Sequence, residues 1–180
     1  LSAVFFCQLF FAESIASSSH DHEIDVVNIQ ELDPTILVDL RYSSKNNFLK
    51  KDIYGDLEEC FLRRKPAEML CQANEHLKAS HPELRLLVFD GLRTRSVQKK
   101  LWDALDTIPV SLRTQFVADP KKGSIHNYGA AVDLTLALEN GSELDMGPEY
   151  DHFGELAFPA LEDSLLALGK LTDKQIKNRT

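Results

Sequence analysis

Residues 122–136 constrain this chain more than any other stretch, because they combine a glycine-containing turn with a strand-like pattern that carries an aspartate. Val132, Leu134 and Leu136 alternate with smaller or polar residues, which is the period of two of a strand with one buried face. If those three side chains face a core, Asp133 points to the opposite side of the sheet. The stretch therefore predicts a carboxylate in the space above a sheet.

His126 precedes Asp133 by seven positions, so a fully extended chain would separate them by roughly 23 Å. The two side chains can meet only if the chain reverses between them. Asn127-Tyr128-Gly129 favours such a reversal, because Asn and Gly tolerate positive φ. An imidazole and a carboxylate at one point suit a divalent ion, above all zinc. A hydrogen-bonded pair without metal is the alternative that these two residues alone leave open.

The spacing Ser124-x-His126-x6-Asp133, with Gly129-Ala130-Ala131 inside it, resembles the S-x-H-x-x-G-x-A-x-D motif of the zinc D-Ala-D-Ala dipeptidases of the VanX type. That family shares a fold group with the zinc DD-carboxypeptidases and the hedgehog signalling domain. Further segments are similar to family motifs in the same order: L-R-Y-x-x-x-x-N-F…Y-G at residues 40–55, D-x-Y-R-P-x-x-x-Q at residues 90–98, and M-G-x-x-F-D at residues 146–151. The resemblance extends from about Asn28 to the last residue.

This resemblance implies an α+β fold, with a small and mainly antiparallel sheet, helices packed on one side, and a metal at the open face of the sheet. It implies that His126 and Asp133 are zinc ligands. Asp151 would hold the ammonium group of a free dipeptide and Ser124 its carboxylate, while Tyr42 would line the same pocket. An enzyme that binds both charged ends would cleave a dipeptide and spare longer peptides.

Arg93 stands where the family has its catalytic arginine, at the point where a predicted strand gives way to a helix. In the family, zinc polarises the scissile carbonyl and carries the attacking water, and the arginine stabilises the oxyanion. Leu92 and Thr94 depart from the family's Tyr and Pro, which removes one possible hydrogen bond and loosens the turn that aims Arg93. From the residues alone, a surface salt bridge is the alternative for this arginine.

The family's G-F-x-x-x-x-x-E-W-W-H segment supplies a general-base Glu and a third zinc ligand, and neither occurs in these 180 residues. A catalytic zinc normally has three protein ligands and a water. We therefore expect one zinc ion with two ligands from this chain, in a chain that is incomplete at both ends and weakly active or inactive. The alternative is a non-catalytic zinc-binding or peptidoglycan-binding relative with the same fold.

Residues 1–16 combine an apolar run with small residues at a cleavage-site spacing, which predicts the remnant of a secretory signal. A buried N-terminal helix is the alternative. Residues 17–23 form a polar linker whose His20 and His22 are expected to be solvated, and residues 24–180 form a single zinc domain. We therefore expect an exported, periplasmic protein.

A net charge of −8 argues against a nucleic-acid partner, because phosphates require a basic face. The expected partner is a small dipeptide. The apolar N-terminal run is too short for a membrane span of about 20 residues, so none is expected in the mature protein. Outside the predicted signal, Cys60 and Cys71 either pair or stay as free thiols.

The apolar periodicity predicts several elements in chain order. They are a strand at 35–40, a helix from about 66 to 77, a buried strand at 84–90, a helix from about 96 to 105, an Asn-Gly hairpin at 138–144, a helix from 161 that is interrupted at Gly169, and a last helix capped by Thr172. The histidines at 76, 81 and 152 are expected to be ordinary helix-end or loop residues rather than ligands.

Overall fold

The main sheet of the protein has three strands, in the order β2 (Leu37–Val38), β4 (Leu84–Asp90) and β5 (Asp133–Leu138). Strand β2 is parallel to β4, and β4 is antiparallel to β5. A second small sheet pairs β1 (Val26–Asn28) with β3 (Phe61–Arg63). The computed structural model describes residues 25–179, so the predicted signal (1–16) and linker (17–23) lie outside the described residues. The arrangement confirms the α+β prediction.

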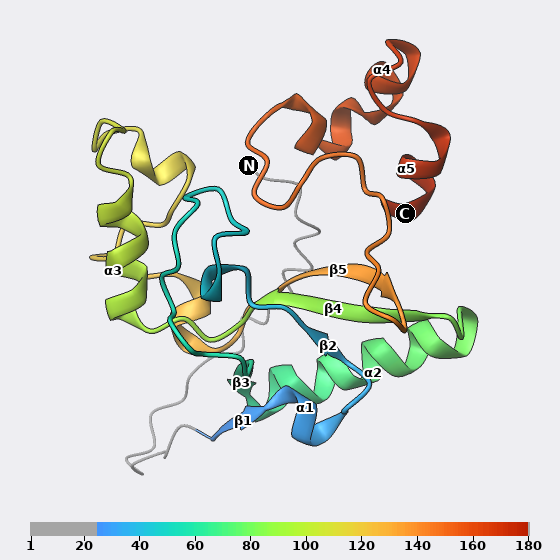
Figure 1. Ribbon diagram of the computed structural model, residues 1–180, viewed down its shortest axis with the longest axis horizontal. Coiled ribbons are helices and arrows are strands. Elements are labelled where there is room, and N and C mark those ends of the chain that lie inside the picture. Colours follow the sequence, from blue (N-terminus) through green and yellow to red (C-terminus); the bar gives the residue numbers. More distant parts are fainter. Residues whose placement is uncertain (1–24, 180) are drawn as a thin grey trace, which may run out of the picture.

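Helix α2 (Arg64–Ser80) covers one face of the main sheet and runs below it in Figure 1. Its buried positions include Ala67 and Leu70, which belong to the same core cluster as Leu86 and Val88 of β4. The predicted apolar side chains at 132, 134 and 136 pack against this cluster. The alternation in this stretch therefore has the predicted meaning, and Asp133 lies on the other face.

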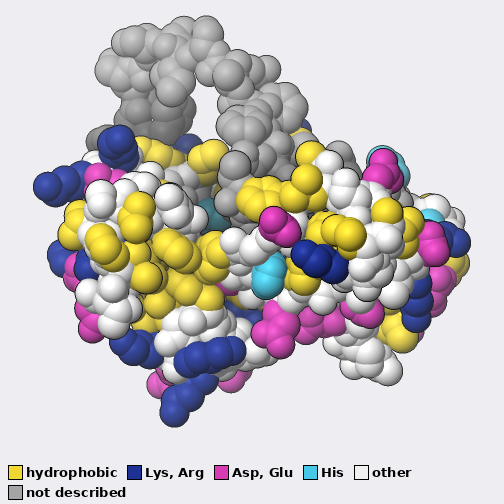
Figure 2. Space-filling view, turned by 90° about the horizontal axis from the view of Figure 1, so that it is seen from above, with side chains coloured by type: hydrophobic (Ala, Val, Ile, Leu, Met, Phe, Trp, Pro, Cys, Tyr) yellow, Lys and Arg dark blue, Asp and Glu magenta, His cyan; other side chains and the backbone are white. Residues whose placement is uncertain are grey.

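Two shorter helices flank the sheet. The first, α1 (Ile29–Leu32), contacts α2, and α3 (Arg95–Ala104) follows β4 after a short turn. The side chain of Thr94 caps α3 by accepting a hydrogen bond from the backbone N–H of Val97 at 3.3 Å. Viewed from above, apolar side chains gather on the side of the molecule where α3 lies (Figure 2).

The C-terminal segment lies above the main sheet, opposite α2 (Figure 1). It contains α4 (Glu162–Ala167) and α5 (Asp173–Arg179). Gly169, at φ 65°, ends α4, and the side chain of Thr172 accepts from the backbone N–H of Gln175 at the start of α5. Both breaks lie where the sequence predicts them.

Of two elements predicted from local sequence pattern, the Asn-Gly hairpin forms in full and the strand before Arg41 forms only in part. The Asn-Gly turn forms as predicted, with the Leu138 N–H donating to the Ser142 carbonyl at 2.9 Å. The strand predicted at 35–40 contains only Leu37 and Val38, because the chain turns at Leu40 into the 3-10 helix Arg41–Ser43.

Cys60 and Cys71 are free thiols. Within residues 25–179, no helix combines the length and apolar character needed to cross a bilayer.

Candidate active site

A cavity of about 1170 Å³ lies between the face of β5 that carries Asp133 and Thr135 and the loops that follow this strand. Its walls come from the ends of β4 and β5, from the 3-10 turns at 41–43 and 125–128, and from residues 143–159. All six residues predicted for the site line this cavity: Tyr42, Arg93, Ser124, His126, Asp133 and Asp151. The fold thus brings together every candidate, and their individual roles stay predictions.

The turn that delivers His126 is the 3-10 helix Ile125–Tyr128. Ser124 caps it by accepting from the His126 N–H at 3.3 Å, and the Asn127 side chain accepts from the Ser124 N–H at 2.8 Å. Gly129 then takes the left-handed conformation at φ 62°, and a Cβ there would lie 3.0 Å from the backbone nitrogen of Arg63. Glycine is therefore required at this point, and the predicted reversal is confirmed.

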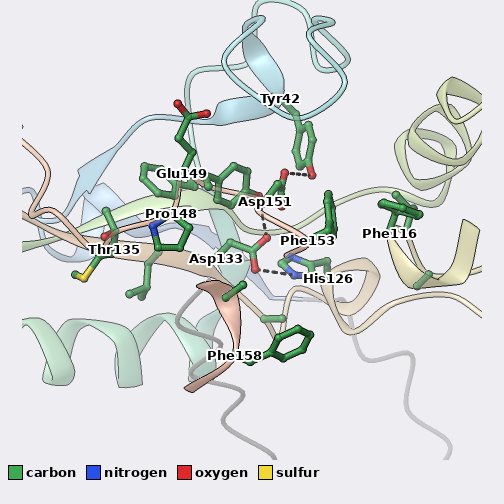
Figure 3. A pocket seen from close by; sticks show the side chains of 18 of the residues that line it. Tyr42, Phe116, His126, Asp133, Thr135, Pro148, Glu149, Asp151, Phe153 and Phe158 are labelled. Carbon is green, nitrogen blue, oxygen red and sulfur yellow. Dashed lines mark hydrogen bonds and ion pairs between the residues drawn. The ribbon is translucent and has the colours of Figure 1, made fainter. Parts of the chain in front are cut away.

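The reversal places His126 Nε2 3.6 Å from Asp133 Oδ1, as the dashed contact in Figure 3 marks. Both residues are about 95% buried, at 5% exposure each. The other ring nitrogen, Nδ1, lies 2.9 Å from the Gly91 carbonyl, to which it donates a hydrogen bond. This bond leaves the lone pair on Nε2 facing the carboxylate when the ring is neutral.

Asp133 Oδ1 is buried and has no hydrogen-bond partner, which is costly for a carboxylate oxygen. A metal ion at this point would satisfy it. Zinc binds nitrogen and oxygen ligands at about 2.0–2.2 Å, so two ligand atoms on one tetrahedral ion lie about 3.4 Å apart. The observed separation of 3.6 Å between Nε2 and Oδ1 fits that geometry. The residues present therefore suit a zinc ion.

Asp90 is the third acidic or imidazole group in this buried cluster, within 4.8 Å of the others. Its oxygens are already engaged. They accept from the Tyr54 hydroxyl, from the Gly91 N–H at 3.0 Å, and from Nε and Nη2 of Arg93. Because these donors occupy the carboxylate, Asp90 serves to hold Arg93 rather than to bind an ion.

Arg93 is buried at 8% exposure, with its guanidinium fixed from two sides. Asp90 takes one edge, and the side-chain oxygen of Gln98 accepts from Nη1 at 3.1 Å. Gln98 is itself fully buried on α3 and donates to the Ala118 carbonyl at 2.8 Å. The guanidinium is therefore held at the cavity wall by a buried network, and the surface-salt-bridge interpretation is wrong.

Charges in this cluster shift the pKa values of the central pair. Burial alone would lower the pKa of His126, but the nearby carboxylates of Asp133 and Asp90 raise it above its ordinary value. Burial alone would raise the pKa of Asp133, but His126 and Arg93 lower it. A divalent cation favours the same ionised carboxylate.

The opposite wall of the cavity is built from loop residues. The Tyr42 hydroxyl donates to Asp151 Oδ2 at 2.9 Å, and the Tyr150 hydroxyl donates to Asp133 Oδ2 at 3.1 Å. Burial, and next the negative charge of Asp133, raise the pKa of Asp151 to about 7. Burial and the charge of Asp133 also raise the pKa of Tyr150, which keeps its hydroxyl protonated as a donor. Figure 3 shows Tyr42, Asp151, Asp133 and His126 pointing toward one another.

An aromatic cluster closes one side of the cavity. Phe153 packs edge-on against Phe116, with ring centroids 4.7 Å apart, and against Phe48 at 5.1 Å. Phe116 and Phe153 both line the cavity. Such rings exclude water from one side of the buried charges, which strengthens electrostatic interactions there.

Comparison with known proteins identifies the family of this chain. The family model described as D-ala-D-ala dipeptidase matches residues 22–166, which include all six candidate residues. This chain belongs to the D-Ala-D-Ala dipeptidase family. One curated relative, the D-alanyl-D-alanine dipeptidase of Escherichia coli (strain K12), is 30% identical over 131 residues, or 73% of this chain and 63% of the relative. The match thus spans less than two thirds of the length of that relative.

Within this dipeptidase-family chain, sequence reasoning assigned no role to the residues that hold the candidates in place, although Tyr54, Asp90 and Gln98 stand in the motif segments at 40–55 and 90–98. Asp90, Tyr54 and Gln98 fix Arg93, and Tyr150 contacts Asp133. The acidic end of an otherwise apolar strand, Leu84–Asp90, was a signal for Asp90. A glutamine at a buried helix position is a weaker signal for Gln98. His152 is not part of the acidic cluster found among the described residues.

Proposed function

We propose that this chain binds one zinc ion through His126 and Asp133 and hydrolyses the dipeptide D-Ala-D-Ala. The observation that carries the proposal is the unpartnered Asp133 Oδ1, buried and 3.6 Å from His126 Nε2. When bound, zinc supplies a Lewis acid for the scissile carbonyl and a water of lowered pKa. Hydrolysis of D-Ala-D-Ala adds one water across the amide bond and yields two molecules of alanine.

Arg93 is the residue we assign to the oxyanion. Its bonds to Asp90 and Gln98 do not use all five N–H groups of a guanidinium, and the side chain lines the cavity. A guanidinium that is fixed before the reaction begins stabilises developing negative charge without reorganising. Its aim comes from the buried network of Asp90 and Gln98, which occupy the Asp and Gln positions of the motif that residues 90–98 resemble.

Asp151 and Ser124 are assigned to the two charged ends of the dipeptide. An ammonium group beside Asp151 favours its ionised form and lowers its raised pKa, so binding and ionisation support each other. Ser124 lines the same cavity, and its hydroxyl can donate to a carboxylate. Tyr42 orients Asp151 through the 2.9 Å hydrogen bond. Recognition of both ends restricts the substrate to free dipeptides.

A second candidate function is zinc-dependent binding of the same ligand without turnover. The observation in its favour is that the described residues bring only two uncommitted ligand atoms to one point, since Asp90 is occupied by Arg93. A catalytic zinc normally has three protein ligands. The two candidates share the metal site and differ in whether alanine is released.

One experiment tests both. The full 180-residue chain is loaded with zinc and given D-Ala-D-Ala or N-acetyl-D-Ala-D-Ala, which lacks the ammonium group, and alanine release and ligand binding are measured. We expect weak, zinc-dependent release from the free dipeptide, because the described residues supply two uncommitted zinc ligands and no assigned general base. Action on the acetylated dipeptide should be at least about tenfold weaker still, as the loss of a charge-assisted hydrogen bond implies. His126→Ala should abolish the zinc dependence.

Equal rates on the two substrates would contradict the assignment of Asp151. Zinc-dependent binding without alanine release would favour the second candidate function. If dipeptide binding and alanine release did not depend on zinc and were unchanged in His126→Ala, neither candidate function would involve a metal.

A further inference from the structure

The two carboxylate oxygens of Asp133 lie in different surroundings. Oδ2 accepts a hydrogen bond from the Tyr150 hydroxyl at 3.1 Å. Oδ1 has no hydrogen-bond partner and faces His126 Nε2 at 3.6 Å. One carboxylate oxygen is therefore hydrogen-bonded to the protein, and the other is available to bind a ligand such as a metal ion.

The two oxygens of a carboxylate do not differ in this way unless their surroundings distinguish them. They are chemically equivalent, and the terminal torsion of an aspartate is broad and roughly two-fold. Without an external donor, either oxygen can face the imidazole, and both can approach one cation together. A single hydrogen-bond donor on one side removes that equivalence.

Tyr150 is such a donor, and we propose that it is a positioning residue: its hydroxyl holds Oδ2 of Asp133 so that Oδ1 alone is presented beside His126 as a one-oxygen metal ligand. This inference rests on the metal site of the proposed function. It assigns to Tyr150 a role in tuning metal affinity through Asp133, without contact with the ion.

The tyrosine ring is itself fixed, which the role requires. It packs edge-on against Phe89, with ring centroids 5.1 Å apart and an interplanar angle of 64°. It also packs against Tyr42 at 6.2 Å and 67°. Phe89 belongs to β4 and Asp133 begins β5, so the ring bridges the sheet and the loop that carries Asp151. The hydroxyl therefore has a defined position relative to the carboxylate.

The hydroxyl is also a departure from the motif that this segment resembles. The motif that residues 146–151 resemble has phenylalanine at the position of Tyr150, so the family pattern provides the ring without the donor. Tyr150→Phe is consequently the least disruptive test, because it keeps the packing on Phe89 and Tyr42 and removes one oxygen atom.

Tyr42→Phe is the matched control. It deletes the same atom from a neighbouring ring in the same aromatic cluster, but that hydroxyl donates to Asp151 and not to Asp133. Asp133→Ala gives the reference for complete loss of the ligand. Thermal unfolding of each metal-free protein, monitored by circular dichroism, verifies that the variants fold.

Zinc affinity is measured for the full chain by competition with a chromophoric chelator, and the visible spectrum of the cobalt-substituted protein reports on coordination. Partners that orient a metal ligand typically contribute 10–100-fold to metal affinity. We expect Tyr150→Phe to weaken zinc binding by about tenfold or more and to change the cobalt spectrum. Tyr42→Phe should stay within about threefold of the unsubstituted protein, well below the effect of an orienting partner.

If Asp133→Ala loses zinc while Tyr150→Phe binds it as the unsubstituted protein does, the positioning role is overturned and the metal site stands. If Asp133→Ala itself binds zinc normally, the metal site is wrong and the role of Tyr150 falls with it. Equal losses in Tyr150→Phe and Tyr42→Phe would also overturn the inference, because the effect would then follow from any lost hydroxyl in the cluster.

Discussion

The two walls of the cavity are built in different ways. On the sheet side, residues 90–93 and 124–127 are joined by hydrogen bonds that involve backbone atoms: the Arg93 N–H donates to the His126 carbonyl at 3.0 Å, and the Asn127 side chain donates to the Arg93 carbonyl at 2.8 Å. On the loop side, Tyr42, Tyr150 and Asp151 are connected to the site by single side-chain hydrogen bonds.

This difference separates two tasks. The groups proposed to hold the ion and the oxyanion are fixed by the β4–β5 ladder and by the turns at its end, where displacement is most costly. Of the groups proposed to hold the ends of a dipeptide, Asp151 and its partner Tyr42 lie on the loop side, whose segments have fewer backbone hydrogen bonds and open at lower free energy. Ser124, proposed to hold the carboxylate end, belongs to the sheet side. The comparison predicts that substitutions in the two walls affect different measurements.

The largest expected effect is on the sheet side, for Arg93→Lys. A lysine cannot contact Asp90 and Gln98 and still present a donor to the cavity, because it lacks the planar fork of arginine. In the zinc-loaded protein, we expect kcat for D-Ala-D-Ala to fall by about 10²–10³, the usual cost of losing one oxyanion donor. The dipeptide KM and the zinc affinity should change little.

Arg95→Lys is the control for this prediction, because Arg95 is exposed on the same segment. It should retain the rate of the unsubstituted protein. A large increase in KM without a change in kcat would instead place Arg93 among the groups that bind the substrate before reaction.

The next effect concerns how the loop wall is held, and involves Arg179. This buried side chain donates to the carbonyls of Met146 and Leu156 at 2.7 and 3.0 Å, and to Glu162 at 3.0 Å. Arg179→Lys cannot satisfy all three acceptors, and we expect it to destabilise this wall by about 2 kcal/mol, as for the loss of a charge-assisted hydrogen bond. Hydrogen exchange should show lost amide protection at residues 145–170, while β4 and β5 stay protected.

Arg64→Lys supplies the comparison for Arg179→Lys, since Arg64 forms an exposed ion pair with Asp25. Surface pairs of this kind contribute about 0–1 kcal/mol. If Arg179→Lys reduced protection equally in the sheet and in the loops, the two walls would unfold as one unit and the proposed division would be wrong.

The same division explains what the sequence could predict. The alternation at 132–136 and the turn at 127–129 are local patterns, and they correctly predicted a strand and a reversal that bring His126 to Asp133. The family resemblance added Tyr42, Arg93, Ser124 and Asp151, all of which line the cavity.

Contacts between distant segments were not predictable in this way. Asp90 reaches the cluster because the register of β4 and β5 shifts between Val88 and Asp90, which pairs Asp90 with Asp133. Two buried carboxylates on opposed residues would repel each other, and Arg93 offsets that cost. No periodicity in the sequence encodes the bulge or the donor that Tyr150 provides from 17 residues further along the chain.

The smallest expected effect is on stability and concerns Asp151→Asn in the metal-free protein. The folded pKa of about 7 lies above the ordinary value of about 3.9 for an unfolded aspartate. Between these values the folded state binds more protons, so the contribution of this group to stability falls as pH rises from about 4 to about 7 and stays low above that. An asparagine is neutral at all these pH values and can still accept from Tyr42.

We therefore expect Asp151→Asn to raise the melting temperature at pH 8, by about 2–4 °C for each kcal/mol of charge-burial cost that the neutral side chain removes, and to change it much less at pH 5. The backbone of Asp151 has φ 59°, a left-handed conformation that asparagine also adopts readily, so the substitution adds no strain of its own. Asp106→Asn, at an exposed position, is the matched control and should show no such gain.

Thermal unfolding in a metal chelator at the two pH values makes the comparison. An equal shift at pH 5 and pH 8 would mean that charge at position 151 is not the cause. A gain confined to pH 8, accompanied by loss of dipeptide binding, would show that the loop wall gives up stability for recognition, whereas the sheet wall does not.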